Sequence, residues 1–211
     1  MTTATRSIAM LVAFVIVAAC LPFSARADAA DWSVELKGGR FTPDLDDYGE
    51  FYGGDDSAYF AIAATWLARP WLEVGTELGY FDDDGVGVLP ATGGRGAPVE
   101  YTLWPLHVFA TVRGLFAPGQ LFVPYAGAGA TIAYYEQQVS QQPDRSGRTD
   151  LGWNARAGVQ LLLDRVDPVT AAESGLLENT YLFVEGQWFS TEIDDIDLGG
   201  YAWLLGFKLE F

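Results

Sequence analysis

The chain ends on YAWLLGFKLEF (201–211), and this stretch decides the fold. Every second residue is apolar or aromatic: Tyr201, Trp203, Leu205, Phe207, Leu209 and Phe211. The residues between them are small, mixed or charged, with Lys208 and Glu210 last. This period-two alternation predicts a β-strand with one apolar face. A strand of a soluble protein would usually continue into a polar tail, whereas this strand stops on an aromatic residue.

The other end of the chain has the composition of a secretory signal peptide. Arg6 precedes an apolar stretch (8–19), and Ala25 to Ala27 form a small-x-small cleavage site. The apolar stretch is too short to cross a bilayer as a helix. We therefore predict two parts, a signal peptide over 1–27 and a mature barrel over 28–211.

The only cysteine of the chain, Cys20, lies inside the predicted signal peptide. Cleavage after Ala27 would remove it, and the mature chain would then have no disulfide and no thiolate metal site. The alternative is a lipidated Cys20, because the stretch from Val17 to Cys20 resembles a lipoprotein box.

The mature chain is strongly acidic and also rich in apolar residues. The 12 Lys and Arg residues include Arg6 and Arg26 of the signal, so ten remain against 28 Asp and Glu residues, a net charge of −18. Such a chain repels the phosphates of nucleic acid, and we expect no nucleic-acid partner. Half of the residues are hydrophobic, which excludes a disordered chain. The length suits one domain.

Alternation of the same kind recurs through the mature chain and predicts eight strands. They lie near residues 32–41, 57–68, 71–81, 100–114, 121–135, 150–163, 180–190 and 201–211. Tight turns alternate with long polar segments, as in transmembrane β-barrels with short periplasmic turns and longer extracellular loops. The segments that we expect to be extracellular loops are 42–56, 82–98 and 136–149.

One connection, 164–179, is too long for a simple turn. Asp167 as N-cap, Pro168 at the first helical position and Gly175 as terminator predict a short helix in this connection. The helix would lie in the periplasm, between the sixth and the seventh strand.

The seven tryptophans favour a barrel that spans a membrane. If the N-terminus is periplasmic, Trp32, Trp66 and Trp71 lie at periplasmic strand ends, and Trp104, Trp153, Trp188 and Trp203 lie near extracellular ends. Membrane interfaces select such aromatic girdles. We therefore predict an all-β fold, an eight-stranded antiparallel up-and-down transmembrane β-barrel. The alternative, a soluble eight-stranded barrel such as a lipocalin, gives no reason for this sorting.

The end of the chain also resembles a known signal. Gly206 stands five residues before the terminal Phe211, as in the insertion signal of outer-membrane proteins, although Leu204 replaces a residue that is usually polar. The likeness extends to three inner stretches: 123–130 (VPYAGAGA), 152–164 and 179–188. The chain resembles the small outer-membrane barrels, the group that contains the OmpA membrane domain and OmpW, and within it short barrels without assigned activity.

This resemblance implies a location in the bacterial outer membrane. It implies contact with outer-membrane lipid and lipopolysaccharide, and insertion by the barrel-assembly machinery through the signal that ends at Phe211. We also expect a monomer without a cofactor.

The less apolar faces of the predicted strands carry a nearly balanced set of charges. Five acidic and four basic residues face the lumen, together with the only histidine: Glu35, Lys37, Glu73, Glu77, His107, Arg113, Arg156, Glu185, Lys208 and Glu210. An eight-stranded barrel leaves only enough space for side chains, and charges away from water must be paired. We therefore predict a lumen plugged by a charged network rather than a water-filled pore.

Strand order predicts which of these charges are neighbours. Three groups are expected: Glu73 with Arg113, Arg156 with Glu185, and, where the last strand closes onto the first, Glu35 and Lys37 with Lys208 and Glu210.

Some eight-stranded barrels are enzymes that act on lipid A, with a histidine in the catalytic group. His107 is the only histidine, no serine follows two residues later, and its position in the alternation directs it toward the lumen. Asp56-Ser57 is a lone dipeptide in the first loop, and a nucleophile without a nearby base is poorly activated. We therefore predict no catalytic residue and no enzyme. A lipid A-modifying enzyme is the least favoured alternative.

The predicted loops hold the surplus of acidic residues. Asp44-x-Asp46-x-Tyr48 resembles the start of a calcium loop but lacks its third oxygen side chain and its closing glutamate. The weak candidates for a divalent cation are Asp44, Asp46, Asp82, Asp83, Asp84, Asp194 and Asp195. We expect a solvated acidic rim and no specific metal site. Weak cation binding shared with lipopolysaccharide phosphates is the alternative.

These features favour an outer-membrane barrel of structural or surface-interaction type, with a plugged lumen and acidic extracellular loops. The alternative is a narrow channel or a lateral route for small hydrophobic molecules. Such a passage requires a gap lined by Leu103 and Phe109.

Overall fold

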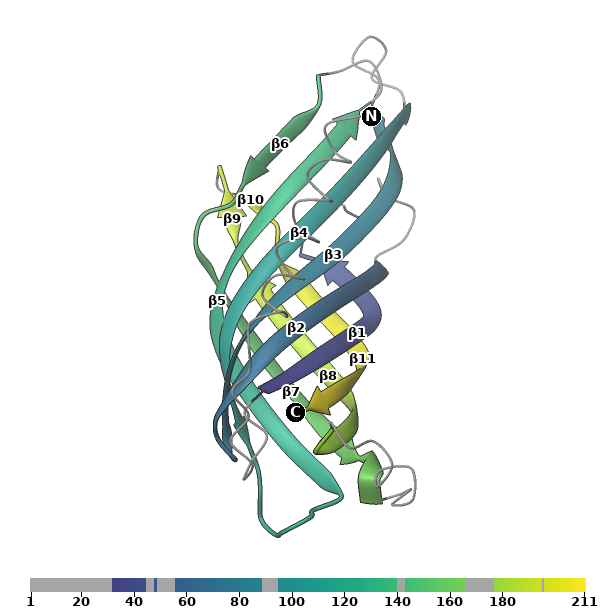
Figure 1. Cartoon of the computed structure of the whole chain (residues 1–211). Helices are drawn as coiled ribbons and strands as arrows, with labels where there is room; N and C mark the ends of the chain where they lie inside the picture. Colours follow the sequence, from purple (N-terminus) through teal and green to yellow (C-terminus); the bar gives the residue numbers. More distant parts are fainter. Residues whose placement is uncertain are drawn as a thin grey trace.

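The computed structural model describes residues 32–44, 48, 56–88, 95–139, 143–165, 177–194 and 196–211. Within these residues, eight long antiparallel strands form a closed barrel (Figure 1). They are β1 (Trp32–Pro43), β2 (Ser57–Arg69), β3 (Leu72–Val88), β4 (Arg95–Arg113), β5 (Phe122–Val139), β7 (Gly152–Leu162), β8 (Asn179–Ser190) and β11 (Gly200–Glu210). Three short strands are added: β6 (Arg145–Arg148) beside β5, and the hairpin of β9 (Glu192–Ile193) and β10 (Ile196–Asp197).

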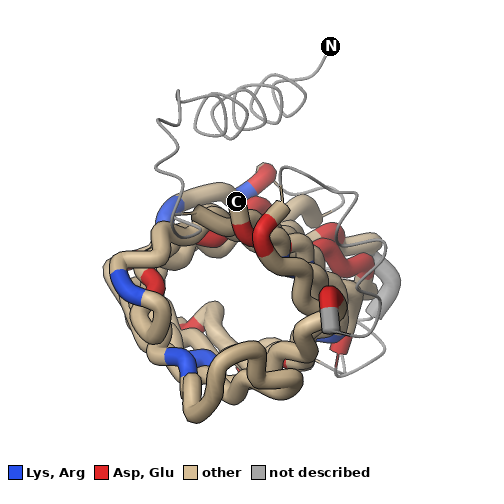
Figure 2. The backbone as a smooth tube through the Cα atoms, turned by 60° about the horizontal axis from the view of Figure 1, so that its bottom comes forward, with Lys and Arg blue, Asp and Glu red and all other residues tan. Residues whose placement is uncertain are grey.

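The long strands follow one another around the barrel in sequence order. Each pairs with the next long strand along the chain, and β11 pairs with β1 to close the barrel. Seen from one end, the backbone forms a closed ring (Figure 2). The predicted eight-stranded up-and-down barrel is therefore confirmed.

The strict alternation in β11 separates a buried face from an exposed face. Its buried residues are Ala202, Leu204, Gly206, Lys208 and Glu210, and its exposed residues are Tyr201, Trp203, Leu205 and Phe207. The other long strands contribute further exposed apolar residues to the same outer surface: Leu36, Phe60, Trp66, Val74, Leu106, Val108, Val112, Trp153, Val159, Val184 and Trp188. Exposing so much apolar area to water is unfavourable, whereas a lipid-facing wall requires it. The exterior is the membrane-facing side of the barrel.

Three strands continue beyond the predicted loop boundaries. The segment 82–98, expected to be a loop, is largely a paired extension of β3 and β4. β5 likewise runs into the segment 136–149, as far as Val139. These extensions rise above the other strands in the upper part of Figure 1. The sequence does not reveal them because a ribbon in water needs no apolar outer face, so Asp82 to Asp84 carry no period-two signal.

Two predictions fall outside the described residues. The helix expected over 167–175 lies between η1 (Leu163–Arg165), a single 3₁₀ turn, and the next described residue, 177. The signal peptide over 1–27 also lies outside them. No helix within the described part of the chain is long and apolar enough to cross a membrane.

The ladder between β3 and β4 is interrupted at Pro105. The register does not shift between the pairs Leu78–Leu106 and Phe81–Leu103, but Gly79 and Tyr80 between them form no ladder pair with Pro105 and Trp104. The reason is that Pro105 has no N–H group to donate to β3. A groove of about 390 Å³ lies on the outer surface at this level, and Gly79, Tyr80 and Trp104 are among its lining residues.

The seam between β1 and β11 depends on a glycine. A Cβ atom on Gly39 would lie 1.9 Å from the carbonyl oxygen of Trp203, so β1 can approach β11 this closely only without a side chain at that position. The neighbouring Gly38 differs, because a Cβ there would lie 3.5 Å from the Phe60 ring, an ordinary contact. The seam ends with a hydrogen bond from the Phe211 N–H to the Trp32 carbonyl oxygen, 2.9 Å long.

We expect Gly39→Ala to destabilise the closed barrel by about 1–3 kcal/mol, because the added methyl group overpacks the seam. Gly38→Ala, the matched control one residue away, should fold like the wild type. The measurement is electrophoretic migration after incubation at increasing temperature, since a closed barrel and an unfolded chain migrate differently. Equal transition temperatures for the two variants would show that the seam is assigned wrongly.

Candidate functional site

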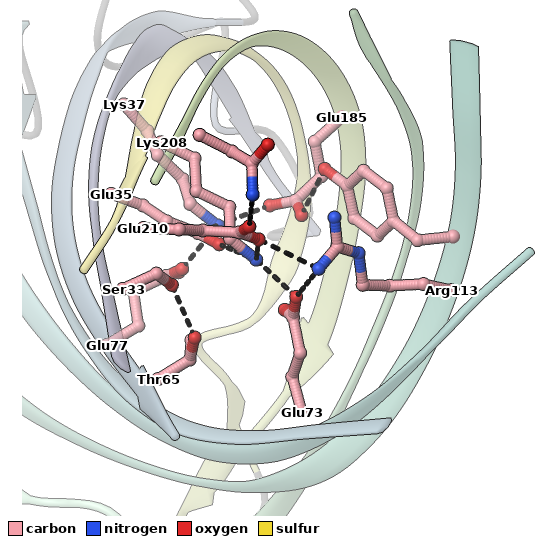
Figure 3. Close-up of polar contacts among 12 residues, drawn as sticks. Ser33, Glu35, Lys37, Thr65, Glu73, Glu77, Arg113, Glu185, Lys208 and Glu210 are labelled. Carbon is pink, nitrogen blue, oxygen red and sulfur yellow. Dashed lines mark hydrogen bonds and ion pairs between the residues drawn. The ribbon is translucent and has the colours of Figure 1, made fainter. Parts of the chain in front are cut away.

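A layer of buried charges lies inside the barrel, in the half of the lumen nearer to Trp32 and Phe211 (Figure 3). Arg113 bridges Glu73 and Glu210, with nitrogen–oxygen distances of 3.1 and 2.8 Å. Lys208 also contacts Glu73 and lies 3.7 Å from Glu210 and 3.8 Å from Glu35. Two cations, one from β4 and one from β11, therefore share the same two carboxylates.

A second group of charges is centred on Lys37 and Glu77. The Lys37 Nζ has three carboxylate neighbours: Glu77 at 2.7 Å, Glu185 at 2.8 Å and Glu35 at 3.1 Å. Arg156 on β7 reaches the Glu77 carboxylate at 2.8 Å. Because Glu35 lies near both Lys37 and Lys208, the two groups form one network. We call this set of nine charged side chains the ion-pair network.

Neutral side chains complete the ion-pair network, which has five carboxylates but only four cations. Three neutral donors bind carboxylates: Gln187 to Glu77 at 2.8 Å, Tyr125 to Glu185 at 2.9 Å, and Asn179 to Glu210 at 2.9 Å. All nine charged side chains are buried. Buried charges are tolerated only with such partners, so the network holds the strands that carry it in one arrangement.

Two of the expected neighbour groups are found, one of them in part. Glu73 pairs with Arg113, and Glu35 stands opposite Lys208 across the seam. Lys37, however, stands opposite Gly206 and directs its charge to the second group rather than to Glu210.

The expected pair of Arg156 with Glu185 is wrong. The register places Gln187 opposite Arg156 and Gly158 opposite Glu185. Arg156 instead pairs with Glu77 on β3, which is not a neighbouring strand. An eight-stranded barrel is narrow enough for a long side chain to reach the far wall, and strand order does not reveal such pairs.

His107 lies in the lumen and is fully buried. Its Nδ1 atom is 2.7 Å from the Thr131 hydroxyl oxygen, and its ring packs against Phe189 with centroids 5.1 Å apart. Asp56, the other residue weighed for catalysis, lies before β2 and binds the Arg40 guanidinium at 2.6 and 2.9 Å. That hydrogen bond holds the pKa of the Asp56 carboxyl below its usual range. The structure does not bring His107 and Asp56 together.

The candidate cation ligands do not gather. Among the described residues no three acidic or histidine side chains are placed to hold a metal ion. Asp46 and Asp195 lie outside the described residues. Tyr48, the third position of the calcium-loop pattern, is buried and donates its hydroxyl hydrogen to Asp83.

Above the ion-pair network, apolar side chains fill the lumen. We call this group the aromatic seal; its members include Phe41, Tyr48, Tyr59, Phe81, Tyr101, Leu103, Phe189 and Leu204. Phe41 lies at its centre, stacked on Phe189 at 5.1 Å and edge-on to Phe81 at 5.0 Å. The sequence contained a signal for it, because Phe41 has the same parity as Glu35 and Lys37 and therefore faces the same side of β1.

The two residues expected to line a passage are packed instead. Leu103 is fully buried in the aromatic seal. Phe109 is buried beneath the Arg156 guanidinium, whose central carbon lies 3.6 Å from the ring centroid. This cation–π contact adds to the stability of the network.

Solved structures share this architecture. The chain is similar to the outer membrane protein OprG from Pseudomonas aeruginosa, with a TM-score of 0.59, 12% identity, and coverage of 87% of this chain and 98% of that chain. It is similar to neisserial surface protein A, with a TM-score of 0.55, 11% identity, and coverage of 87% and 99%. For the N-terminal β-barrel domain of Pseudomonas aeruginosa OprF the values are 0.51, 11%, 87% and 100%.

The protein is an outer-membrane β-barrel. The closed wall with an apolar exterior requires a membrane, and the shared fold is that of small bacterial outer-membrane barrels. No protein-family model matches the sequence, and no curated protein matches it either. At these identities the solved structures show the fold of this barrel and not its activity.

The central position of Glu77 in this outer-membrane barrel can be tested by mutation. Glu77→Leu leaves Arg156 without its ion pair and should lower the free energy of unfolding by about 3–5 kcal/mol. Adding Arg156→Met should recover most of that loss, because an apolar pair replaces a buried charge pair. The measurement is urea unfolding in lipid, followed by tryptophan fluorescence.

The control for this experiment is Asp84→Asn, which neutralises an exposed carboxylate on β3. We expect it to unfold no more easily than the wild type, because it removes no buried ion pair and relieves the like-charge contact with Glu100. A double variant as unstable as Glu77→Leu alone would contradict the assigned role of the Glu77–Arg156 pair.

Proposed function

We propose that this outer-membrane barrel is of structural or surface-interaction type and passes no solute through its lumen. The observation that supports this most directly is that the lumen is filled at two levels. The ion-pair network occupies the half of the lumen that we assign to the periplasmic side, and the aromatic seal fills the next level. A solute would have to break both, and the network alone is expensive to break.

The charge distribution supports a role for the extracellular surface. Four of the ten basic residues of the mature chain are buried in the lumen, so few remain to balance the acidic loops. On the extension of β3 and β4, Asp84 stands directly opposite Glu100, and both are exposed. Like charges directly opposite each other on two paired strands destabilise that pairing. We propose that the acidic surface serves contact with cations and, through them, with lipopolysaccharide phosphates.

The remaining parts of the proposal concern assembly and chemistry. Phe211 would serve as the signal for the barrel-assembly machinery, and the barrel would act as a monomer. We propose no enzyme activity. A catalytic histidine of the lipid A enzymes acts together with a nucleophile and an acidic residue, whereas the hydrogen-bond partner of His107 is the Thr131 hydroxyl.

The sealed lumen predicts almost no steady current when the pure protein is inserted into a planar bilayer. Liposomes that contain it should not swell in small sugars either. Insertion is verified in the same sample by the heat-dependent shift in migration. Reproducible openings of uniform size from verified, pure protein would overturn the proposal.

A second candidate function is a lateral route for small hydrophobic molecules, and one observation favours it. The interrupted ladder at Pro105 lies between the aromatic seal and the outer groove. On the inside, the Tyr59 hydroxyl occupies the space that a side chain at Gly79 would need. An apolar molecule that displaced part of the seal would meet the weakest part of the wall here.

The substitution Pro105→Val tests the lateral route, because it restores the N–H group that the β3–β4 ladder lacks. If the route operates, uptake of a small hydrophobic dye into liposomes should fall in this variant. The matched control is Pro124→Val, because Pro124 also lies within a strand, β5, but not at the interruption. Equal uptake by the wild type, both variants and protein-free liposomes would exclude the route.

A further inference from the structure

A ring of polar side chains lies where the ion-pair network meets the aromatic seal. We call it the mid-lumen ring; it consists of Glu77 and Arg156, which also belong to the ion-pair network, and of His107, Thr131, Asn154 and Gln187. On one side, the Thr131 hydroxyl lies 2.7 Å from His107 Nδ1 and accepts a hydrogen bond from Asn154 Nδ2 at 3.1 Å. This makes a chain of three side chains from β4, β5 and β7.

The other side of the ring is centred on Glu77. Arg156 and Gln187 each donate to one of its carboxylate oxygens, both at 2.8 Å. Glu77 stands opposite His107 on the neighbouring strand. Asn154 and Arg156 are two residues apart on the same buried face of β7. The two sides of the ring therefore lie next to each other at the same level of the lumen.

The mid-lumen ring has unused hydrogen-bonding atoms. Within the described residues, five of its atoms have no hydrogen-bond partner: His107 Nε2, Asn154 Oδ1, Arg156 Nε, Arg156 Nη2 and Gln187 Oε1. Each of the four side chains is at most 3% exposed. Buried polar atoms in folded proteins are almost always hydrogen-bonded, and five exceptions within one ring point to a bound molecule.

The types of these atoms identify the molecule. The Thr131 hydroxyl accepts from Asn154 and can donate its own hydrogen to His107 Nδ1. We take this arrangement for the proposal, and in it the hydrogen of a neutral imidazole lies on Nε2. The ring then offers three donors, His107 Nε2 and two nitrogens of Arg156, and two acceptors, the amide oxygens of Asn154 and Gln187. Arg156 repels a cation and Glu77 repels an anion, whereas a water molecule both donates and accepts and makes about three hydrogen bonds.

We propose that the mid-lumen ring binds one or more water molecules, which join its two sides into one network. Phe189 closes the site toward the aromatic seal, with its ring 5.1 Å from that of His107. The ion-pair network closes it toward the periplasm. The site is a hydrated compartment inside a lumen that is sealed to ions.

His107 provides a single-residue probe, because it is the only histidine of the chain. The protein, purified without a histidine tag, is labelled with ¹⁵N at histidine and studied by NMR in lipid nanodiscs. We expect a neutral imidazole with its hydrogen on Nε2, and a nuclear Overhauser cross-peak between that hydrogen and water. A persistent hydrogen signal without a water cross-peak would mean a dry site. Loss of the signal through rapid exchange would mean an open lumen, and either result overturns the proposal.

A pair of variants on β7 makes the test specific. Asn154→Leu removes one acceptor of the mid-lumen ring, and we expect loss of the water cross-peak. Gln160→Leu removes an amide on the same face whose oxygen also lacks a partner among the described residues, but which is outside the ring; the cross-peak should remain. An unchanged cross-peak in a folded Asn154→Leu variant contradicts the assigned site. Should that variant not fold, the wild-type spectrum decides alone.

Discussion

The narrow lumen is the constraint on which the rest of the structure depends. An eight-stranded barrel has space for side chains but not for bulk water, so every charge that points inward must find its partner there. The ion-pair network draws its charges from β1, β3, β4, β7, β8 and β11, six of the eight long strands. A shift of one residue in any of these strands would turn its charges toward lipid. The network therefore specifies the register as well as filling the space.

The seam shows how closely the backbone must comply with this arrangement. Glu35 and Lys208 can stand opposite each other only where β1 and β11 approach, and Gly39 permits that approach by having no side chain. The buried charges and Gly39 therefore both stabilise the pairing of β1 with β11 that closes the barrel. The lipid-facing surface of the barrel constrains the sequence less, because lipid accepts any apolar side chain and requires no specific contact.

The two levels that fill the lumen differ in what they exclude. The ion-pair network provides fixed partners for charged groups, and the aromatic seal fills its level of the lumen with closely packed, mainly apolar side chains. The mid-lumen ring lies between them and holds unused polar atoms. A lumen organised in this way is compatible with local hydration but not with conduction. We propose that the acidic extension of β3, β4 and β5 faces the outside of the cell and carries the interactions of the protein.

Alternation alone determined the strand count, the topology, the lipid-facing side and the residues that face the lumen, because a strand turns every second side chain to the same face. The alternation was sufficient to predict that His107 and Arg156 face the lumen. It could not reveal the paired extension beyond Asp82, since a ribbon in water has no apolar face to mark it. Nor could it show that Arg156 pairs with Glu77, or that Phe41 meets Phe189. Those contacts join strands that are not neighbours, and they arise from the diameter of the closed barrel, which only the tertiary structure determines.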